Sequence, residues 1–403
     1  MEEAGKRKKG HMVESVRLGR ERLILDPSRE YGLVLEGGGA KGAFQIGAWR
    51  ALKEAGIRIR GVSGVSVGAL NGALICMDDL EKAENIWENM DPSVVLSLNM
   101  SPENLQEAAA EVKRIIKDRG LDIAPLRKLI HETVDEEKIR NSPCELYATT
   151  FSITDLQLLK KDVKTMPPGE IEDILMASAY LPGFKSEKLG GKLYADGGTL
   201  DNVPIQVLLD QGYRDIIVIR IYGIGLDRVR WTKIPDGTKV FYIAPREDLG
   251  GMLEFDRKRS RKNMALGYLE ACRLLYGLKG RRYYIDAPHG EPYYFDRMMS
   301  ELELLKLYLR EVLDEETMAC MDGYRFFTEH IFPELARKWE LPENWNYKDI
   351  YLGLLEELAA RFQLSRYRVY TADELAGAVH RAILQTDGIL PSVTGPERYG
   401  ECF

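Results

Sequence analysis

The chain has 403 residues, of which 45% are hydrophobic and 30% are charged. This length has room for about two domains, and the composition is that of an ordinary globular protein, which excludes a disordered, collagen-like or membrane-embedded chain. The 63 Asp and Glu residues outnumber the 56 Lys and Arg residues and give a formal net charge of −7. We therefore expect no nucleic-acid partner, because bulk attraction to a polyanion requires net positive charge.

The cysteines and the N-terminus indicate a reducing compartment. The five cysteines lie far apart without CxxC spacing, which predicts neither a disulfide framework nor a zinc site. The basic residues 6–9 are not followed by an apolar run, so no signal peptide is expected, and no window of about 18 residues is apolar enough to cross a bilayer. We expect a cytoplasmic protein whose residues 1–30 form a basic, flexible tail.

Between residue 31 and about residue 278, short apolar runs alternate with helical patterns, which is typical of βα units and a mostly parallel sheet. Strands are predicted at 32–35, 57–62, 145–153, 216–221 and 240–244, and helices at 42–55 and 66–77. A charged helical stretch at 80–134 is too long for an ordinary connection between strands. It predicts a lid or a helical insertion.

The pattern becomes helical after residue 292. Residues 298–313 and 351–362 have helical apolar spacing, and Thr371 with Glu374 predicts a capping box that opens another helix. We predict no strand in this part of the chain. The expected division is a tail at 1–30, an α/β domain at 31–290 and a helical C-terminal extension at 291–403.

The first candidate functional element is the turn Gly37-Gly38-Gly39-Ala40-Lys41-Gly42, between a predicted strand and a predicted helix. Glycines permit a tight turn whose N–H groups converge at a helix N-terminus and bind an anion. The GxGxxG spacing would also fit a dinucleotide, but the acidic Glu54 lies within the predicted helix and not after the second strand. A P-loop is excluded, because Lys41 is followed by glycine and not by Ser or Thr.

The second candidate element is Gly64-Val65-Ser66-Val67-Gly68, again where a strand meets a helix. A nucleophilic serine needs its hydroxyl at the apex of a sharp turn, and small residues such as Gly64 and Gly68 let the strand and the helix approach. Ser66 acting only as a helix N-cap is the alternative. Because both glycine-rich turns follow strands of consecutive βα units, we expect them at the same edge of the sheet, where ligands bind.

A nucleophilic serine also needs a group that accepts its proton. The histidines offer no turn motif of their own, and a triad would have to recruit His289 or His330. Asp196 instead follows an apolar strand directly and precedes Gly197 and Gly198. Asp-Gly is ordinarily a turn signal, but here it also supplies a carboxylate able to accept the proton of Ser66.

The three elements in this order resemble the patatin-like phospholipase family, whose pattern is a glycine-rich oxyanion turn, a GxSxG elbow and a DGG or DGA aspartate. Residues 177–184 and 201–205 resemble the family's segments before and after the catalytic aspartate. The resemblance covers about residues 31–285. Glu36 stands where many members have Asp, which keeps the acidic charge, and Lys41 stands where Arg or Lys is usual.

This resemblance implies a three-layer α/β/α catalytic domain that acts on phospholipids or other acyl lipids without a metal or an organic cofactor. It implies that Ser66 is the nucleophile, that Asp196 is its proton acceptor, and that N–H groups of residues 37–42 form the oxyanion hole. Because an aspartate with an ordinary pKa is a poor base for a hydroxyl, we expect partial burial to raise the pKa of Asp196.

Two alternatives to the Ser66–Asp196 dyad stay open at the level of sequence. One is a Ser-His-Asp triad with His289 or His330, and the other is a catalytically dormant module that binds lipid or protein. Contact with a membrane surface is a further expectation, because five basic residues crowd a predicted helix at 257–262. A solvated helix face is the alternative interpretation of that helix.

Overall fold

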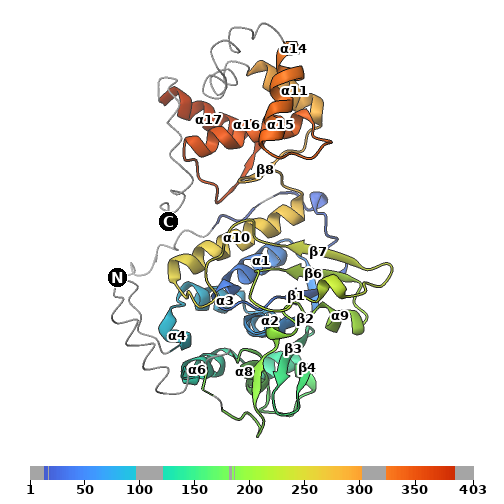
Figure 1. Ribbon diagram of the computed structural model, residues 1–403, viewed down its shortest axis with the longest axis vertical. Coiled ribbons are helices and arrows are strands. Elements are labelled where there is room, and N and C mark those ends of the chain that lie inside the picture. The colour runs from blue at the N-terminus through green and yellow to red at the C-terminus, as the bar shows by residue number, and fades with distance from the viewer. Residues whose placement is uncertain are drawn as a thin grey trace, which may run out of the picture. The chain divides into compact units, whose positions relative to one another are not determined.

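The computed structural model in Figure 1 describes residues 13–16, 18–96, 121–180, 184–185, 187–301 and 324–385. The chain forms two compact units, Met1–Leu275 and Tyr276–Phe403. The predicted boundary of the catalytic domain at residue 290 stays a prediction, while the two compact units divide after Leu275. The reason is that residues 284–286 pair with a strand of the C-terminal unit.

The N-terminal unit is built on a seven-stranded sheet in the order β4-β3-β2-β1-β6-β7, with β5 paired to β3. The strands are β1 (Glu30–Leu35), β2 (Arg58–Val65), β3 (Glu145–Ser152), β4 (Gln157–Asp162), β5 (Tyr194–Asp196), β6 (Asp215–Ile219) and β7 (Lys239–Ile243). The neighbouring pairs β3–β2, β2–β1, β1–β6 and β6–β7 are parallel. Within this sheet, only β4 and β5 run antiparallel, both to β3. The predicted mostly parallel sheet is therefore confirmed.

Helices cover both faces of this sheet, which explains why its central strands are apolar throughout. Helix α9 (Ile205–Asp210) packs on Val34 of β1 and on Ile216 and Val218 of β6. On the opposite face, the glycines of α2 (Val67–Cys76) let this helix pack directly against Leu35 and against β2 and β3. The layered α/β architecture is that expected from the sequence.

Helices α1 (Ala43–Glu54) and α10 (Arg257–Tyr276) lie side by side (Figure 1). A Cβ atom on Gly47 would collide with the backbone of Met264, and one on Gly267 would collide with the backbone of Phe44. Glycine at these two positions therefore permits the close approach of the two helices.

The predicted helical insertion is present where the structure describes it. It consists of α3 (Leu80–Glu88), α4 (Pro92–Leu96), α6 (Ala124–Thr133) and α7 (Glu136–Asn141), while residues 97–120 lie outside the described residues. Helix α8 (Ile171–Ser178) follows β4. Short turns of 3-10 helix complete the unit: η1 (Arg20–Arg22), η2 (Gly39–Gly42), η3 (Val163–Thr165), η4 (Gly197–Thr199) and η5 (Val229–Trp231).

The C-terminal unit is mainly helical, with α11 (Glu291–Ser300), α14 (Tyr324–Phe326), a π-helical turn (Phe327–Ile331), α15 (Phe332–Lys338), α16 (Tyr347–Arg361) and α17 (Ala372–Gln385). The predicted capping box is present, since the N–H of Glu374 donates to Thr371 Oγ1 at 3.1 Å and the N–H of Thr371 donates to Glu374 Oε2 at 2.8 Å. The helix predicted at 298–313 is described only to Ser300, because residues 302–323 lie outside the described residues.

The expectation that this unit holds no strand was wrong. Val369–Thr371 forms β9, which pairs in parallel with β8 (Tyr284–Asp286). Three residues are too few for an alternating pattern to be recognised, and Thr371 also belongs to the capping box. Near this pair, the buried carboxylate of Glu356 accepts backbone N–H bonds from Arg281, Arg282 and Tyr283 at 2.8 to 2.9 Å.

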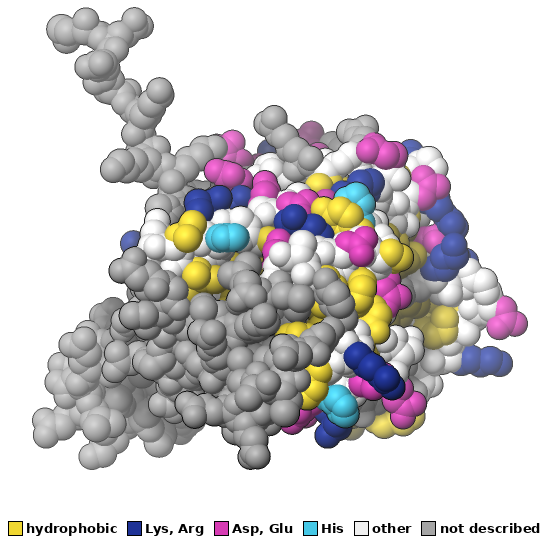
Figure 2. Space-filling model, turned by 90° about the horizontal axis from the view of Figure 1, so that it is seen from above, with side chains coloured by type: hydrophobic (Ala, Val, Ile, Leu, Met, Phe, Trp, Pro, Cys, Tyr) yellow, Lys and Arg dark blue, Asp and Glu magenta, His cyan; other side chains and the backbone are white. Residues whose placement is uncertain are grey.

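Surface charges of both signs are mixed. On the face shown in Figure 2, acidic and basic side chains alternate with small groups of hydrophobic ones. The net charge of −7 is therefore not gathered into an acidic patch on this face. Within the described residues, no helix is both long enough and apolar enough to span a bilayer.

Candidate active site

Ser66 lies at a sharp elbow between β2 and α2. Its backbone has φ 56° and ψ −129°, a conformation that costs a non-glycine residue on the order of 1–3 kcal/mol and persists only where the surroundings enforce it. The two flanking glycines explain how this is done. A Cβ atom on Gly64 would collide with Gly68, and one on Gly68 would collide with the carbonyl of Leu35. The GxSxG sequence is therefore required by packing at this strand-to-helix junction.

A second serine holds the elbow from the side of α8. The backbone N–H of Ser66 donates to Ser178 Oγ at 2.9 Å, and the hydroxyl of Ser178 donates to the carbonyl of Thr149 at 2.7 Å. Ser178 and Thr149 are fully buried. Sequence reasoning gave Ser178 only as part of a resembling segment and did not predict this role. The bond fixes the backbone of Ser66 without occupying its hydroxyl.

Asp196 is the carboxylate that interacts with the hydroxyl of Ser66. It ends β5, where Asp196 pairs with Thr150 of β3, and its side chain is 6% exposed. It accepts a hydrogen bond from the N–H of Gly198 at 2.8 Å. Burial raises the pKa of Asp196 from 3.8 to about 6, and the interactions of its carboxylate with the hydroxyl of Ser66 and the N–H of Gly198 limit the rise. Strand β3 brings the two side chains together, because it pairs through Thr149 with Val65 at the end of β2 and through the next residue, Thr150, with Asp196.

The glycine-rich turn runs from the end of β1 through η2 into α1. Within it, Gly39 has φ 56°, which is the left-handed region that favours glycine. Some of the N–H groups predicted to bind an oxyanion already donate within the protein. These bonds run from Gly37 to the carbonyl of Asn202 at 3.3 Å, from Ala40 to that of Met252 at 2.8 Å, and from Lys41 to that of Gly38 at 3.3 Å.

The N–H groups of Gly38 and Gly39 are the ones left to bind a ligand. In the part of the chain that the structure describes, neither has a hydrogen-bond acceptor. Gly38 is the N-cap of η2 and Gly39 is its first residue, and N–H groups at these positions have no partner within the helix. Gly39 lines the same cavity as Ser66. We therefore narrow the candidate oxyanion donors from residues 37–42 to Gly38 and Gly39.

Glu36 fastens this turn to the loop that follows β6. Its buried carboxylate accepts hydrogen bonds from Arg220 Nε at 3.0 Å and from the N–H groups of Ile221 and Tyr222 at 2.6 and 3.0 Å. Lys41 adds a bond from Nζ to the carbonyl of Tyr222 at 2.9 Å. The sequence marked Glu36 and Lys41, but not Arg220. A buried carboxylate needs a charged or hydrogen-bonding partner, yet its identity depends on the sheet order.

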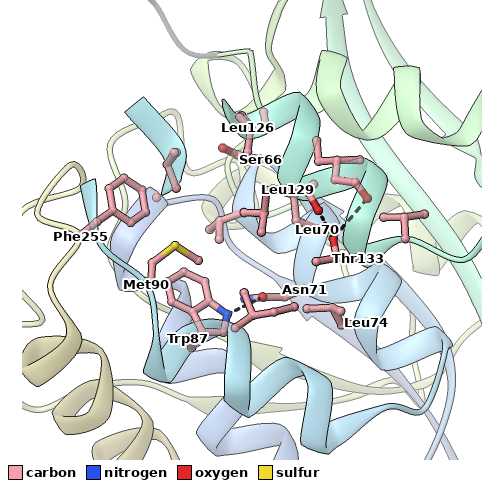
Figure 3. A pocket seen from close by; sticks show the side chains of 17 residues that line it. Ser66, Leu70, Asn71, Leu74, Trp87, Met90, Leu126, Leu129, Thr133 and Phe255 are labelled. Carbon is pink, nitrogen blue, oxygen red and sulfur yellow. Dashed lines mark hydrogen bonds between the residues drawn. The ribbon is translucent and has the colours of Figure 1, made fainter. Parts of the chain in front are cut away.

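An apolar cavity opens beside Ser66 (Figure 3). Its volume is about 70 Å³, several times the space that one water molecule needs. Helix α2 contributes Ser66, Leu70 and Leu74 to its wall, and the helical insertion contributes Trp87 and Leu129. The sequence predicted an insertion at 80–134 without predicting that it would wall this cavity.

The polar groups of the cavity wall already have partners. Asn71 donates to the carbonyl of Gly42 at 3.0 Å and to Gln45 Oε1 at 2.9 Å, and its own Oδ1 accepts the indole N–H of Trp87 at 3.0 Å. The hydroxyl of Thr133 donates to the carbonyl of Leu129 at 2.6 Å. The cavity therefore suits an apolar group, with the Ser66 hydroxyl at its polar end.

The two histidines that a triad could recruit both belong to the C-terminal unit. His289 stacks on Tyr293, with ring centroids 4.1 Å apart, and His330 lies 5.5 Å from the ring of Phe326. Within the N-terminal unit, the hydroxyl of Ser66 interacts with Asp196. Residues 181–183 of the segment that resembles the family lie outside the described residues, while Asn202 holds Gly37 as described above.

A strained serine beside a buried aspartate, both carried by a layered α/β sheet, is the geometry of a serine hydrolase. Residues 33–209 match the family model described as Patatin-like phospholipase. This part of the chain therefore belongs to the patatin-like phospholipase family.

Relatives of known name match a little under half of the chain. "Neuropathy target esterase sws" of Drosophila melanogaster is 31% identical over 195 residues, which cover 47% of this chain and 13% of that protein. The protein of the same name from Drosophila persimilis is 33% identical over 178 residues, covering 43% and 11%. The matches thus span only a small part of these curated relatives.

Solved structures show a weaker likeness. VipD from Legionella pneumophila has 16% identity and a TM-score of 0.39, with 89% of this chain and 87% of that chain covered. ExoU from Pseudomonas aeruginosa, in complex with SpcU, has 16% identity and a TM-score of 0.33, with 88% and 77% covered. Both TM-scores are below 0.5.

The burial of Asp196 predicts that the site destabilises the folded protein at neutral pH. The folded-state pKa of about 6 lies above the ordinary 3.8, so the cost of the buried carboxylate is fully present above pH 6 and disappears below about pH 4. We expect Asp196→Asn to raise the free energy of unfolding at pH 7.5 by about 1–3 kcal/mol and to lose this gain near pH 4. Urea unfolding of the N-terminal unit at both pH values measures it.

The matched control is Asp236→Asn, since Asp236 is exposed in a turn before β7. We expect this change to alter stability by less than about 0.5 kcal/mol at either pH. An Asp196→Asn protein that is less stable than the wild type at pH 7.5 would contradict the interpretation of Asp196 as a destabilising buried carboxylate.

Proposed function

We propose that the chain is a serine acyl hydrolase that cleaves fatty-acyl esters of phospholipids or related lipids with a Ser66–Asp196 dyad. The observation that supports this most is the interaction of the Ser66 hydroxyl, at a strained elbow, with a buried aspartate beside an apolar cavity. The name "esterase" of the relatives agrees with ester hydrolysis, although they are much longer proteins.

In the first half of the reaction, Ser66 Oγ attacks the ester carbonyl while Asp196 accepts the hydroxyl proton. The pKa of about 6 makes Asp196 ionised at neutral pH and a stronger base than an ordinary aspartate. The oxyanion that forms accepts hydrogen bonds from the N–H groups of Gly38 and Gly39. One donor of this kind typically lowers the barrier by about 3 to 4 kcal/mol. Asp196 then returns the proton to the departing alcohol.

The second half of the reaction releases the acid. A water molecule donates its proton to Asp196 and attacks the acyl group on Ser66, and the same two N–H groups stabilise the oxyanion again. When this intermediate collapses, the bond from the acyl carbon to Ser66 Oγ breaks, Asp196 returns the proton to Ser66 Oγ, and the fatty acid leaves. The strained backbone holds the oxygen of Ser66 in place throughout, so little reorganisation accompanies the attack. The dyad therefore performs the acid and base roles that a triad assigns to histidine.

The cavity favours a long acyl chain as the group that Ser66 receives. Ser66, Leu70 and Leu74 are spaced four residues apart on α2, so they line one side of the helix over roughly 12 Å. Figure 3 shows these side chains on the same wall, with Trp87, Met90 and Leu129 among the side chains that complete the lining. Burial of the chain's methylene groups stabilises the complex by about 0.8 kcal/mol per group.

The test of the proposal is fatty-acid release from a panel of phospholipids, lysophospholipids and glycerides. We expect Ser66→Ala and Asp196→Asn each to lower kcat at least about 10³-fold, because the nucleophile and its base act as a unit. We expect His289→Ala and His330→Ala to retain full activity. Equal release by wild type and Ser66→Ala would refute the nucleophile, and loss of activity in a histidine variant would favour the triad. Lipid binding without any hydrolysis would favour the dormant binding module.

The cavity also predicts selectivity for chain length. Leu74 lines it two helical turns from Ser66, so Leu74→Trp should shorten the space for an acyl chain. We expect kcat/KM for p-nitrophenyl palmitate to fall at least about tenfold and that for the butyrate ester to change less than about twofold. Leu384→Trp, at an exposed position in α17, is the control and should change neither. An equal loss on both esters in Leu74→Trp would contradict an acyl chain along α2.

A further inference from the structure

Large apolar side chains are exposed around the candidate oxyanion donors. Five of the eleven such residues in the described part of the chain lie between β6 and β7, and they are Tyr222, Ile224, Leu226, Trp231 and Ile234. Ile224 is 80% exposed and Trp231 is 72% exposed. A sixth, Leu253 at 46%, lies in the loop before α10. Single exposed apolar residues are common, but a group of them at one site marks an interaction surface.

The loop between β6 and β7 and the loop before α10 contact the glycine-rich turn at residues 37–42, the oxyanion turn, from different sides. On one side, a Cβ atom on Gly38 would lie 3.2 Å from Gly223 Cα, next to Tyr222 and Ile224. On the other, Gly39 and Ala40 meet the carbonyl of Met252, the neighbour of Leu253. These contacts hold the exposed side chains beside the turn that precedes the nucleophile's cavity.

The same loops continue to Asp196 and into the cavity. The backbone of Leu226 bonds to Gly198 at 3.2 Å and to Asn202 at 2.9 Å, directly after the DGG sequence. Phe255, two residues beyond Leu253, lines the cavity itself. We name the four residues Tyr222, Ile224, Leu226 and Leu253 the rim. The rim therefore adjoins the oxyanion turn and the DGG sequence, and Phe255 connects the loop of Leu253 to the cavity wall.

We propose that the rim docks on the surface of a phospholipid bilayer and delivers an acyl chain from it to Ser66. This inference rests on the proposed function and adds the surface by which the chain meets its substrate. Ser66 is only 5% exposed, so a lipid must leave the bilayer and enter the cavity for its ester to reach the hydroxyl. A rim seated among the lipid chains keeps the moving acyl chain out of water.

The chemistry around the rim fits a lipid surface that contains anionic headgroups. Arg228 and Lys233 are exposed on the β6–β7 loop, and Lys258 is exposed on the first turn of α10. Two nearby acidic residues are already engaged: Glu254 pairs with Arg259 at 3.3 Å, and Asp256 accepts the N–H of Arg259. Aliphatic and aromatic side chains beside Lys and Arg are the composition typical of peripheral membrane surfaces.

The experiment separates binding from chemistry by using Ser66→Ala as the background. Co-sedimentation with vesicles of phosphatidylcholine and phosphatidylserine measures docking without hydrolysis. We expect Ile224→Asp to weaken vesicle binding at least about tenfold, and Ile224→Asp with Leu253→Asp to weaken it further, because a carboxylate resists transfer into lipid. The control is Ile24→Asp, the same substitution at a 56% exposed residue that precedes β1, at the amino edge of the sheet. It should bind within about twofold of the parent.

The same substitutions in the chain with Ser66 intact test the function of the rim. We expect Ile224→Asp to lower the hydrolysis of vesicle phospholipid about tenfold and to change the hydrolysis of monomeric p-nitrophenyl butyrate less than about twofold. Circular dichroism spectra that match the wild type confirm that the variants fold.

Three results would overturn the inference: vesicle binding that is unchanged in Ile224→Asp, an equal loss in Ile24→Asp, or a change of oligomeric state in Ile224→Asp without vesicles. The last would assign the rim to a second copy of the chain. Failure of the proposed function gives a different result. If the chain needs the rim to bind vesicles but never releases fatty acid, the docking inference stands and the proposed hydrolase function is refuted. If the chain hydrolyses soluble esters but does not bind vesicles, the hydrolase function stands and the docking inference is refuted.

Discussion

The interaction of the Ser66 hydroxyl with the buried carboxylate of Asp196 is the one on which the account of this protein depends. The two residues come together because β3 pairs with the end of β2 through Thr149 and with Asp196 of β5 through Thr150. The same burial that makes Asp196 a better base also destabilises its charged form, so the folded protein pays in stability for a reactive site. The packed glycines of the elbow and the bond from Ser178 hold the strained serine against it.

The oxyanion turn depends on a second buried carboxylate, that of Glu36. Its bonds to Arg220 and to the N–H groups after β6 connect the turn to the loop that presents Tyr222 and Ile224 to solvent. The groups that would stabilise the oxyanion and those that would contact lipid are therefore parts of one connected structure. A change that moves the backbone of the β6–β7 loop is expected to affect both substrate access and the position of Gly38, whereas the surface substitution Ile224→Asp is expected to affect only access from the bilayer.

Local sequence patterns predicted β1, β2, β3, β6 and β7 but not β4. They also predicted the elbow, the glycine-rich turn and the aspartate, because each is written in a short run of residues such as Gly64-Val65-Ser66-Val67-Gly68. The partners that lie far away in sequence were not predicted. Ser178 and Arg220 reach the site only through the order of strands, which one sequence does not reveal. Strand β9 was missed because three residues cannot display a period, and the cavity walls because helical spacing does not say which helix faces which.

The most direct measurement is the rate at which a fluorophosphonate labels the protein, followed by intact-mass spectrometry and peptide mapping between pH 5 and pH 8. Because Asp196 must be ionised to accept the hydroxyl proton, the account predicts one adduct, on Ser66, whose rate of formation falls as the pH drops through about 6. In Asp196→Asn the rate should be at least about 10²-fold lower and should lose this dependence on pH. Labelling of Asp196→Asn at the wild-type rate, or an adduct on another residue, would contradict the account.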